Sequence, residues 1–539
     1  MIRVSLRSSW SVYLGAGYRA GVRNEPSMTP IQLKICGVLF ALHSMAARLA
    51  VVVDGSSLTL RSAMSVAEGG ATVRASPASL KRLAKFRALL EGKLAGGEVV
   101  YGVNTGFGSL ADKVVDSEHL EELQLNLIRS HSSGVGSPLP IPVVRAAMLI
   151  RLNSLLNGNS AVRKEVAGLI MGLLNREVTP LVPEFGSLGA SGDLTPSAHM
   201  ALTLVGEGKA YHDGRLTDSS KALSAAGLKP VHLMAKEGLS LINGTAFTTA
   251  LGCVAVQRGR TLLRASNSAL AMTAEALGAC SQPFQEQLVG MKLDPGQNSV
   301  ARELRGFLKG SRRMRPEPVP QDPYSIRCAP QVHGSLSDAL DFAEKIVVDE
   351  MNSVSDNPVL LEDGEVLHGG NFHAQPVAMS LDLMSLALSY LGVISLSRTH
   401  FLLSKTPPDR KYMAAKPGLE SGLMLLEYTA TALNADNAKN IYPESSYPSN
   451  VSGGIEDHAS HGVNAGVKAL QVAANVSRIL AVELICSSNT IGEAEGGLSE
   501  HTKVLSEFVR SISPLLKGDR SQSEEVESLA GATLAGKLP

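Results

Sequence analysis

The stretch Gly186-Ser187-Leu188-Gly189-Ala190-Ser191-Gly192-Asp193-Leu194-Thr195-Pro196 decides how the rest of this 539-residue chain is interpreted. Its tripeptide Ala190-Ser191-Gly192 can become an electrophile. If the Gly192 nitrogen attacks the Ala190 carbonyl and two waters leave, one of them from the Ser191 hydroxyl, the product is a 4-methylideneimidazol-5-one ring. Glycine suits the attacking position because it has no Cβ and tolerates the backbone distortion of a five-membered closure.

Three other interpretations compete for this stretch. The first is a loop that leads into a helix, with Ser191 or Asp193 as N-cap and Pro196 in the first turn, and we expect that geometry in addition to the ring. A nucleophilic serine is disfavoured because Asp193 stands where a nucleophile elbow has its last glycine. A phosphate-binding loop is disfavoured because no Lys-Ser or Lys-Thr pair follows the glycines.

Five motifs, in order along the chain, give the tripeptide its context. They are Tyr101-Gly102-Val103-Asn104-Thr105-Gly106-Phe107-Gly108, the segment from Gly189 to His199, Asn243-Gly244-Thr245, Gln321-Asp322-Pro323-Tyr324-Ser325-Ile326-Arg327 and Gly369-Gly370-Asn371-Phe372-His373. Together they resemble the aromatic amino-acid ammonia-lyase family, from about residue 48 to the C-terminal region. The resemblance implies a mainly α fold: a mixed N-terminal domain that carries the tripeptide, and a long central helical bundle of the fumarase/aspartase type. It also implies a homotetramer with active sites shared between subunits.

The resemblance assigns roles to several side chains. Tyr101 matches the tyrosine that removes the substrate β-proton, and the glycines after it suit a loop that closes over substrate. Arg327 should bind the substrate carboxylate, because a planar guanidinium can donate two parallel hydrogen bonds. Tyr324 joins Tyr101 and the tripeptide as a catalytic residue, and the expected lining residues are Asn243, Gln321 and Phe372. His199 and His373 are expected to be structural.

Two further positions bear on the substrate. Ser130-His131 resembles the Ser-His pair of histidine-specific members, and its imidazole can hydrogen-bond an imidazole or a phenol. Glu456 also matches the histidine-specific pattern and would face a substrate imidazole, whereas its ordinary alternative is an exposed capping glutamate. The residues before it, Gly454 and Ile455, depart from the Asn-Gln pair that is usual in the family.

The leading hypothesis is the non-oxidative deamination of L-histidine to trans-urocanate and ammonia. The ring formed from Ala190-Ser191-Gly192 would be the cofactor, with neither metal nor nucleotide. Deamination of tyrosine or phenylalanine is the main alternative, followed by a 2,3-aminomutase that uses the same ring and returns ammonia to the β-carbon. A non-catalytic helical assembly protein would show a damaged site, whereas the expected catalytic and binding residues are present: Tyr101, Ser191, Asn243, Tyr324 and Arg327.

Composition favours an enzyme that acts on a small molecule. The 50 basic and 50 acidic residues balance, so that no basic excess points to nucleic acid and no acidic excess points to disorder. The five cysteines are scattered without paired metal spacing, which favours reduced thiols in the cytoplasm.

The chain is expected to divide into four parts. Residues 1–47 are rich in arginine and poor in acids, as in a transit peptide, but Met45 directly precedes the family-like start and favours an over-long start or a poorly ordered extension. An N-terminal domain (48–245), a central bundle (246–490) and a helical tail (491–539) follow.

Apolar spacing predicts the elements of these parts. It indicates a strand at 51–53 and helices at 77–94, 118–130 and 333–353. Three stretches, 246–279, 374–403 and 465–488, are long enough to cross a membrane. Charged side chains inside them, such as Arg258, Asp382 and Glu483, instead favour a helical bundle or a subunit interface, and no membrane partner is expected.

Overall fold

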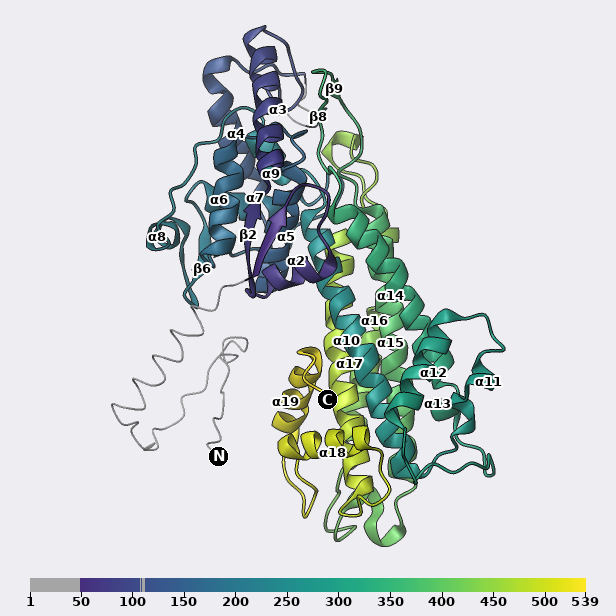
Figure 1. Ribbon diagram of the computed structural model, residues 1–539. Coiled ribbons are helices and arrows are strands. Elements are labelled where there is room, and N and C mark those ends of the chain that lie inside the picture. Colours follow the sequence, from purple (N-terminus) through teal and green to yellow (C-terminus); the bar gives the residue numbers. More distant parts are fainter. Residues whose placement is uncertain (1–48, 107, 109–111) are drawn as a thin grey trace, which may run out of the picture. The chain divides into compact units, whose positions relative to one another are not determined.

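The computed structural model describes residues 49–106, 108 and 112–539, and residues 49–539 form one compact unit. The predictions for residues 1–47 lie outside the described residues. Figure 1 shows that the described chain is mainly helical, as predicted, with short strands confined to a few places.

The first part of the unit packs short helices around small sheets. Its helices are α2 (Leu60–Ala67), α3 (Pro77–Ala95), α4 (Leu120–His131), α5 (Ile141–Leu155), α6 (Lys164–Asn175), α7 (Leu194–Leu204), α8 (Ser219–Ala225) and α9 (Glu237–Ile242). Its strands are β1 (Leu49–Val53), β2 (Ala71–Ala75), β3 (Val135–Pro138), β4 (Thr179–Pro180), β5 (Pro183–Phe185), β6 (Lys209–His212) and β7 (Arg215–Asp218). β1 pairs with β2 in parallel, with Val51 opposite Val73, whereas β3 pairs with β5 and β6 lies between β4 and β7 in antiparallel pairs.

The second part is a bundle built on four long helices, α10 (Ala246–Leu277), α14 (Ala329–Met351), α15 (Gln375–Ser404) and α17 (Gly462–Ile491). In the bundle α17 packs along α10 and α15, and α14 packs along α10 and α15 (Figure 1). The remaining α-helices and strands of this part are α11 (Glu286–Val289), α12 (Pro295–Phe307), α13 (Tyr324–Arg327), β8 (Val359–Leu360), β9 (Val366–Leu367), α16 (Met424–Lys439), α18 (Glu500–Ile512) and α19 (Ser523–Leu534). α14 runs antiparallel to α10, because Glu350 accepts a hydrogen bond from Thr245 while His333 contacts Asn267.

Small residues and a buried ion pair help to fix the packing of this bundle. A Cβ on Gly466 of α17 would lie 2.5 Å from Leu251 on α10, and a Cβ on Gly259 of α10 would lie 2.5 Å from Leu340 on α14. These helices therefore approach one another at positions that leave no room for a side chain. Between α15 and α17, the fully buried Arg398 donates to the fully buried Glu483 at 2.5 Å. Loss of either partner would leave an unpaired buried charge, at a cost of about 3–5 kcal/mol.

The predicted elements agree with the structure to within a few residues. The helix expected at 77–94 is α3, and the helix expected at 118–130 is a 3-10 turn, Ser117–His119, followed by α4. The three long apolar stretches are α10, α15 and α17, and the strand expected at 51–53 is β1. The division of the unit at residues 245 and 490 stays a prediction.

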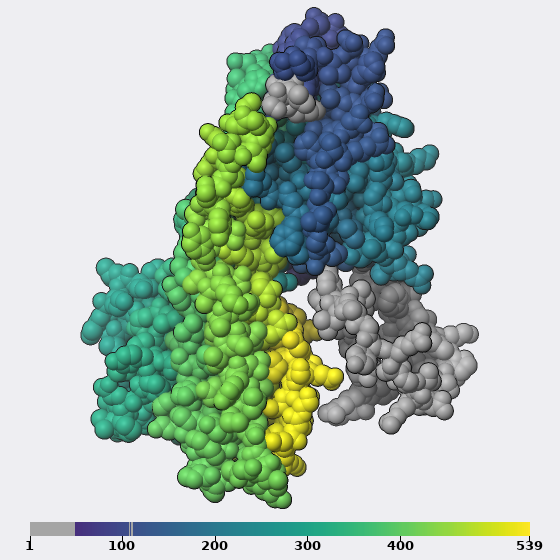
Figure 2. Space-filling view, turned by 180° about the vertical axis from the view of Figure 1, so that it is seen from behind, coloured from purple at the N-terminus to yellow at the C-terminus, as the bar shows by residue number. Residues whose placement is uncertain are grey.

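Among the residues that the structure describes, two helices, α15 and α17, are long and apolar enough to cross a membrane, yet most of their residues are buried inside the unit. They resemble the core helices of a soluble protein. Other apolar side chains remain exposed, among them Tyr390 and Val393 on α15 and Leu425 and Tyr428 on α16. Figure 2 shows the face of the molecule on which α16 and its flanking segments are exposed to solvent, next to the first part of the unit.

Candidate active site

The tripeptide Ala190-Ser191-Gly192 lies in the loop between β5 and α7, against the segment Asn243-Gly244. Asn243 donates from Nδ2 to the Ser191 carbonyl oxygen at 3.0 Å. The Asp193 nitrogen donates to the Gly244 carbonyl oxygen at 2.7 Å, so that Gly192 and Gly244 lie side by side as in a parallel strand pair. The segment that joins α9 to α10 therefore forms the support on which the tripeptide rests.

A second loop, residues 451–461, reaches the tripeptide from another part of the chain. Ser460 donates through both its backbone nitrogen and its hydroxyl to the Gly189 carbonyl oxygen, at 3.1 and 3.2 Å. The Ser191 hydroxyl donates to Glu456 Oε1 at 2.7 Å. The structure thus brings Glu456 and Asn243 together at the tripeptide.

The backbone at Gly192 fits the predicted ring closure. Its φ is +79°, a region that residues with a Cβ rarely adopt. A Cβ at this position would lie 2.5 Å from the Gly244 carbonyl oxygen, so the support also leaves no room for one. Nearby, Asn243 Oδ1 is buried and has no hydrogen-bond partner among the described residues. A ring formed from Ala190-Ser191-Gly192 would need backbone packed closely against Gly192 and a polar atom still able to form a hydrogen bond, and Gly244 and Asn243 Oδ1 provide these.

Asp193 differs from the prediction that it, or Ser191, caps α7. It stands at the N-cap position, but neither side chain caps the helix. Asp193 instead accepts hydrogen bonds from the nitrogen and the hydroxyl of Thr248, both at 2.7 Å, and so ties the tripeptide to the start of α10. Burial raises the pKa of Asp193 to about 6, because the hydrogen bonds from Thr248 only partly offset the loss of solvent.

Tyr101 is half-buried in a loop that approaches the 451–461 loop. Its hydroxyl accepts a hydrogen bond from the Gly108 nitrogen at 3.1 Å, and its ring packs edge-on against His368 with 5.9 Å between centroids. A Cβ on Gly108 would lie 2.9 Å from the Ser452 hydroxyl. The loop that carries Tyr101 therefore borders the loop that carries Glu456. Its residues 107 and 109–111 lie outside the described residues.

His131 ends α4, which packs against α7 and α9, the helices that follow Gly192 and precede Asn243. Its Nδ1 lies 2.8 Å from the Leu127 carbonyl oxygen and 3.1 Å from the Ser130 hydroxyl. Donation from Nδ1 to this carbonyl makes Nε2 the acceptor nitrogen of the ring. The Ser130 hydroxyl and the Leu127 carbonyl oxygen thus orient the His131 ring, and α4 packs on the helices that border the tripeptide.

The loop with Phe372 and His373 belongs to the same end of the bundle. Gly369 donates to Asn357 Oδ1 at 2.8 Å, and His373 stacks on His458 with 5.4 Å between centroids. Phe372 is half-buried in this loop. His199 accepts a hydrogen bond from the Gly134 nitrogen at 3.0 Å, in keeping with the structural role expected of it.

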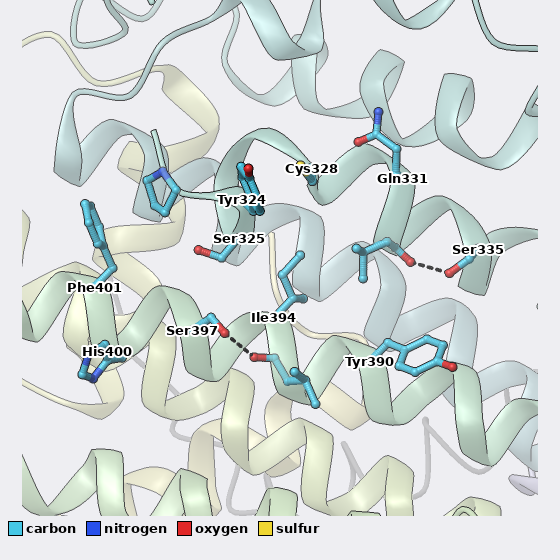
Figure 3. A pocket seen from close by; sticks show the side chains of 13 residues that line it. Tyr324, Ser325, Cys328, Gln331, Ser335, Tyr390, Ile394, Ser397, His400 and Phe401 are labelled. Carbon is cyan, nitrogen blue, oxygen red and sulfur yellow. Dashed lines mark hydrogen bonds between the residues drawn. The ribbon is translucent and has the colours of Figure 1, made fainter. Parts of the chain in front are cut away.

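Gln321, Tyr324 and Arg327 do not meet the tripeptide within one chain. Tyr324 and Arg327 begin and end the short helix α13, with the guanidinium 4.6 Å above the tyrosine ring. Tyr324 is 69% exposed and borders an open apolar cavity of about 810 Å³. Figure 3 shows Tyr324 on one side of this cavity and Tyr390, Ile394 and Phe401 of α15 on the other.

The separation between the two groups follows from the length of α10. Thr248, which holds Asp193, lies near the N-terminus of this helix. His333, just beyond α13, contacts Asn267 much further along it. At about 1.5 Å per residue, Thr248 and Asn267 are about 28 Å apart. The single chain therefore carries two half-sites: one with Tyr101, Ser191, Asn243 and Glu456, and the other with Gln321, Tyr324 and Arg327.

Sequence reasoning missed Arg151, a buried arginine on α5 that donates to the Asn243 carbonyl oxygen and, at 3.1 Å, to the Ser355 carbonyl oxygen. It also missed Ser460. In the sequence, Arg151 stands out only as a charged residue inside the apolar run 141–155. Arg145 lies in the same run, so the sequence does not distinguish the two arginines.

Comparison with known proteins agrees with these motifs. The family model described as aromatic amino acid lyase matches residues 58–512. A histidine ammonia-lyase of Symbiobacterium thermophilum is 42% identical over 495 residues, which cover 90% of this chain and 96% of that protein.

Two solved structures are similar over most of their length. A histidine ammonia-lyase from Trypanosoma cruzi has a TM-score of 0.83 and 35% identity, covering 91% of this chain and 94% of the other. A tyrosine aminomutase from Streptomyces globisporus has a TM-score of 0.85 and 35% identity, covering 91% and 98%. Because the family model spans most of the chain and these similarities extend over nearly all of it, the protein belongs to the aromatic amino acid lyase family.

Proposed function

We propose that this protein is a carbon–nitrogen lyase that deaminates L-histidine to trans-urocanate and ammonia. The observation that carries the proposal is the Glu456 carboxylate, which lies 2.7 Å from the Ser191 hydroxyl. A carboxylate at this point accepts a hydrogen bond from an imidazole N–H, which a phenylalanine ring does not offer. The near full-length similarity to histidine ammonia-lyases supports the same substrate.

The tripeptide Ala190-Ser191-Gly192 would hold the prosthetic group, a 4-methylideneimidazol-5-one ring. The ring supplies an electrophile that activates the substrate for loss of ammonia. Asn243 binds the Ser191 carbonyl oxygen, and Gly244 leaves no room for a side chain at Gly192. Both residues would therefore hold the ring in one orientation toward the substrate.

Tyr101 would take the β-proton of the substrate. Its hydroxyl oxygen accepts a hydrogen bond from the Gly108 nitrogen at 3.1 Å, and this contact fixes the position of the oxygen that would receive the proton. Its loop borders the loop of Glu456, so both groups would face one substrate. His131 would contribute an imidazole nitrogen on the same side.

The carboxylate of the substrate needs Arg327, and we propose that a second copy of the chain supplies it. In one chain, Arg327 and Ser191 belong to separate half-sites. Arg327 Nε is buried without a hydrogen-bond partner among the described residues, and Tyr324 beside it is largely exposed. Packing between copies through the exposed apolar side chains of α15 and α16 would bring the two half-sites together, in a homotetramer with Gln321, Tyr324 and Arg327 acting in trans. Such an enzyme would work in the cytoplasm, on a small molecule alone.

One experiment tests the substrate. The purified protein is incubated separately with L-histidine, L-tyrosine and L-phenylalanine, and ammonia is measured together with the unsaturated acid. We expect urocanate and ammonia in equal amounts from histidine and much slower reaction with the other two. Tyrosine deamination without histidine deamination would contradict the proposal and make the Gly454-Ile455 departure the better guide to the substrate.

A second candidate is a 2,3-aminomutase, which the similarity to a tyrosine aminomutase structure favours. Such an enzyme would return ammonia to the β-carbon and accumulate a β-amino acid. Chromatography of the same reaction mixtures separates the two functions, because a lyase releases free ammonia and a mutase retains the nitrogen in its product.

A further inference from the structure

Arg151 is buried directly behind the support of the tripeptide. One nitrogen of its guanidinium donates to the Asn243 carbonyl oxygen, and another donates to the Ser355 carbonyl oxygen at 3.1 Å. The side chain is 1% exposed. Burial lowers the pKa of Arg151, whereas the negative charges of Asp356 and Asp193 act in the opposite direction. A buried charge on two backbone carbonyls is costly, which points to a specific task for these hydrogen bonds.

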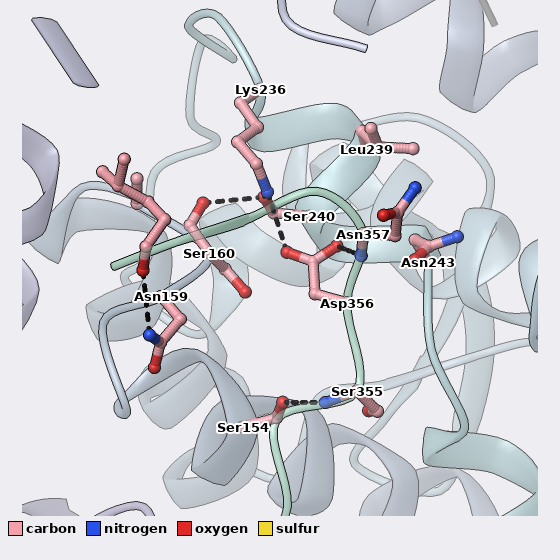
Figure 4. A network of polar contacts seen from close by, with 12 residues as sticks. Ser154, Asn159, Ser160, Lys236, Leu239, Ser240, Asn243, Ser355, Asp356 and Asn357 are labelled. Carbon is pink, nitrogen blue, oxygen red and sulfur yellow. Dashed lines mark hydrogen bonds and ion pairs between the residues drawn. The ribbon is translucent and has the colours of Figure 1, made fainter. Parts of the chain in front are cut away.

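The segment that carries Ser355 is itself anchored (Figure 4). The buried Lys236 binds Asp356 Oδ2 at 2.8 Å and the Ser240 hydroxyl at 3.0 Å. The Ser355 nitrogen donates to the Ser154 hydroxyl, on the same helix as Arg151, at 3.3 Å. The Ser355 carbonyl oxygen is therefore a fixed point, and Arg151 links it to Asn243.

The tripeptide, the support and the Ser355 segment are stacked without free space. A Cβ on Gly192 would lie 2.5 Å from the Gly244 carbonyl oxygen. A Cβ on Gly244 would overlap the Ser355 carbonyl oxygen and lie 2.8 Å from Arg151 Nη1. A shift of Asn243-Gly244 is therefore passed on to the hydrogen bonds that it makes with the Ser191 carbonyl oxygen and the Asp193 nitrogen.

We propose that Arg151 is a positioning residue for the closure of the ring, an inference that rests on the proposed function. Closure forms a bond from the Gly192 nitrogen to the Ala190 carbonyl carbon. The Ala190 oxygen leaves as water with the amide protons of Ser191 and Gly192, and Ser191 loses its hydroxyl and its Cα proton as a second water.

The support binds the chain on both sides of the attacking nitrogen, at the Ser191 oxygen and at the Asp193 nitrogen. Arg151 holds this support from behind, and so keeps the attacking nitrogen aligned with the carbonyl. Lysine cannot replace it, because an ammonium group lacks the planar fork that reaches two fixed carbonyls.

The test is the rate of ring formation in Arg151→Lys. Chain solubilised in denaturant from inclusion bodies, whose tryptic peptide 177–209 still carries its full encoded mass, is refolded, and the mass of this peptide, which contains the tripeptide, is followed over time. In the wild type this peptide loses two waters. We expect Arg151→Lys to slow the loss roughly 10- to 100-fold, since a misplaced reacting group costs about this much. Circular dichroism and thermal unfolding are measured on the same samples.

Arg145→Lys is the matched control. Arg145 lies on the same helix, is 4% exposed, and donates to the carbonyl oxygens of Val66 and Leu174, away from the support. We expect it to lower thermal stability while the peptide loses two waters at the wild-type rate. Gly244→Ala is a second variant, because its Cβ would press on both the Ser355 carbonyl oxygen and the Arg151 guanidinium while the arginine itself is kept. It should also slow ring formation.

The outcomes separate this inference from the proposed function. A wild-type peptide at its full encoded mass would contradict the proposed function itself. A wild-type peptide short by two waters, with the same rate in folded Arg151→Lys or folded Gly244→Ala, would overturn the role of Arg151 alone. Equal slowing in Arg145→Lys would also overturn it, because the effect would then follow from lost stability.

Discussion

The Ser191 hydroxyl donates a hydrogen bond to Glu456 over 2.7 Å, although 265 positions separate the two residues in the chain. Ring formation would remove this hydroxyl as water. The Glu456 carboxylate would then lose its donor and become available to the substrate. If the protein deaminates histidine, the Glu456 carboxylate therefore contacts the Ser191 hydroxyl before the ring forms and the substrate imidazole afterwards.

Glu456→Gln tests this relationship. The amide keeps the size of the side chain but removes the charge, and a hydrogen bond to a charged group is worth about 1.5–3 kcal/mol. We expect kcat/KM for histidine to fall about 10- to 100-fold, and any activity toward tyrosine to fall less. Steady-state kinetics on both substrates check this. An equal loss on both would show that Glu456 does not distinguish the imidazole.

His131→Phe should move the selectivity in the other direction. The variant removes a polar partner of the imidazole and adds an apolar ring, so histidine turnover should fall while phenylalanine turnover rises. A buried polar group left without its partner costs roughly 1–3 kcal/mol. Ring formation, followed by the mass of peptide 177–209, serves as the control. If neither substrate responds, His131 does not contact the substrate side chain.

Tyr101→Phe should lower turnover while leaving the ring intact. General-base catalysis typically contributes about 100- to 10,000-fold, and the phenyl ring keeps the packing against His368. The measurement is kcat for histidine, with the peptide mass as a check on the ring. A variant that keeps wild-type kcat would remove Tyr101 from the role of base.

Arg327→Ala, mixed with Tyr101→Phe, tests whether the half-sites meet between chains. Each variant alone should be nearly inactive. If every site combines Tyr101 of one chain with Arg327 of another, random mixing leaves about a quarter of the sites with both residues. Co-expressed and co-purified variants should therefore recover about a quarter of wild-type activity. Mixed oligomers without any recovered activity would contradict a site shared in this way.

Local sequence patterns were sufficient for the long helices but not for the contacts between them. α15 and α17 have apolar runs that only a buried helix accommodates, and their bounds follow closely from sequence. The pairing of Ser191 with Glu456 depends on the packing of distant loops, which no local pattern contains. Arg151 and Arg145 are equivalent in sequence, and only the tertiary structure shows which of them faces the support. The sequence predicts Ser191 or Asp193 at the N-cap of α7; Asp193 stands there, but its carboxylate accepts hydrogen bonds from the nitrogen and hydroxyl of Thr248 instead of capping the helix.

The stability of the protein should depend on the ionisation of Asp193. Its pKa is about 6 in the folded chain against 3.8 in the unfolded one, so the folded state binds a proton more readily. This contribution is fully present below about pH 4 and is lost as the pH rises through 6, with a maximum of roughly 3 kcal/mol. Relative to Asp193→Asn, the chain should therefore become more stable as the pH falls from 7 to 4.

Thermal unfolding of the two chains at several pH values checks this prediction. Both are prepared with Ser191→Ala, so that ring formation does not differ between them. The difference in Tm between the chain that keeps Asp193 and the chain with Asp193→Asn should grow in favour of aspartate at low pH. A difference that stays constant from pH 7 to 4 would show that Asp193 keeps an ordinary pKa.

The mass of the tryptic peptide 177–209, taken from a preparation that deaminates histidine, tests the central claim most directly. We predict that this peptide is short by two waters, that the same peptide from Ser191→Ala carries its full encoded mass, and that this variant is inactive. The full encoded mass in a wild-type preparation that is active would contradict the account, because the electrophile would then not come from Ala190-Ser191-Gly192.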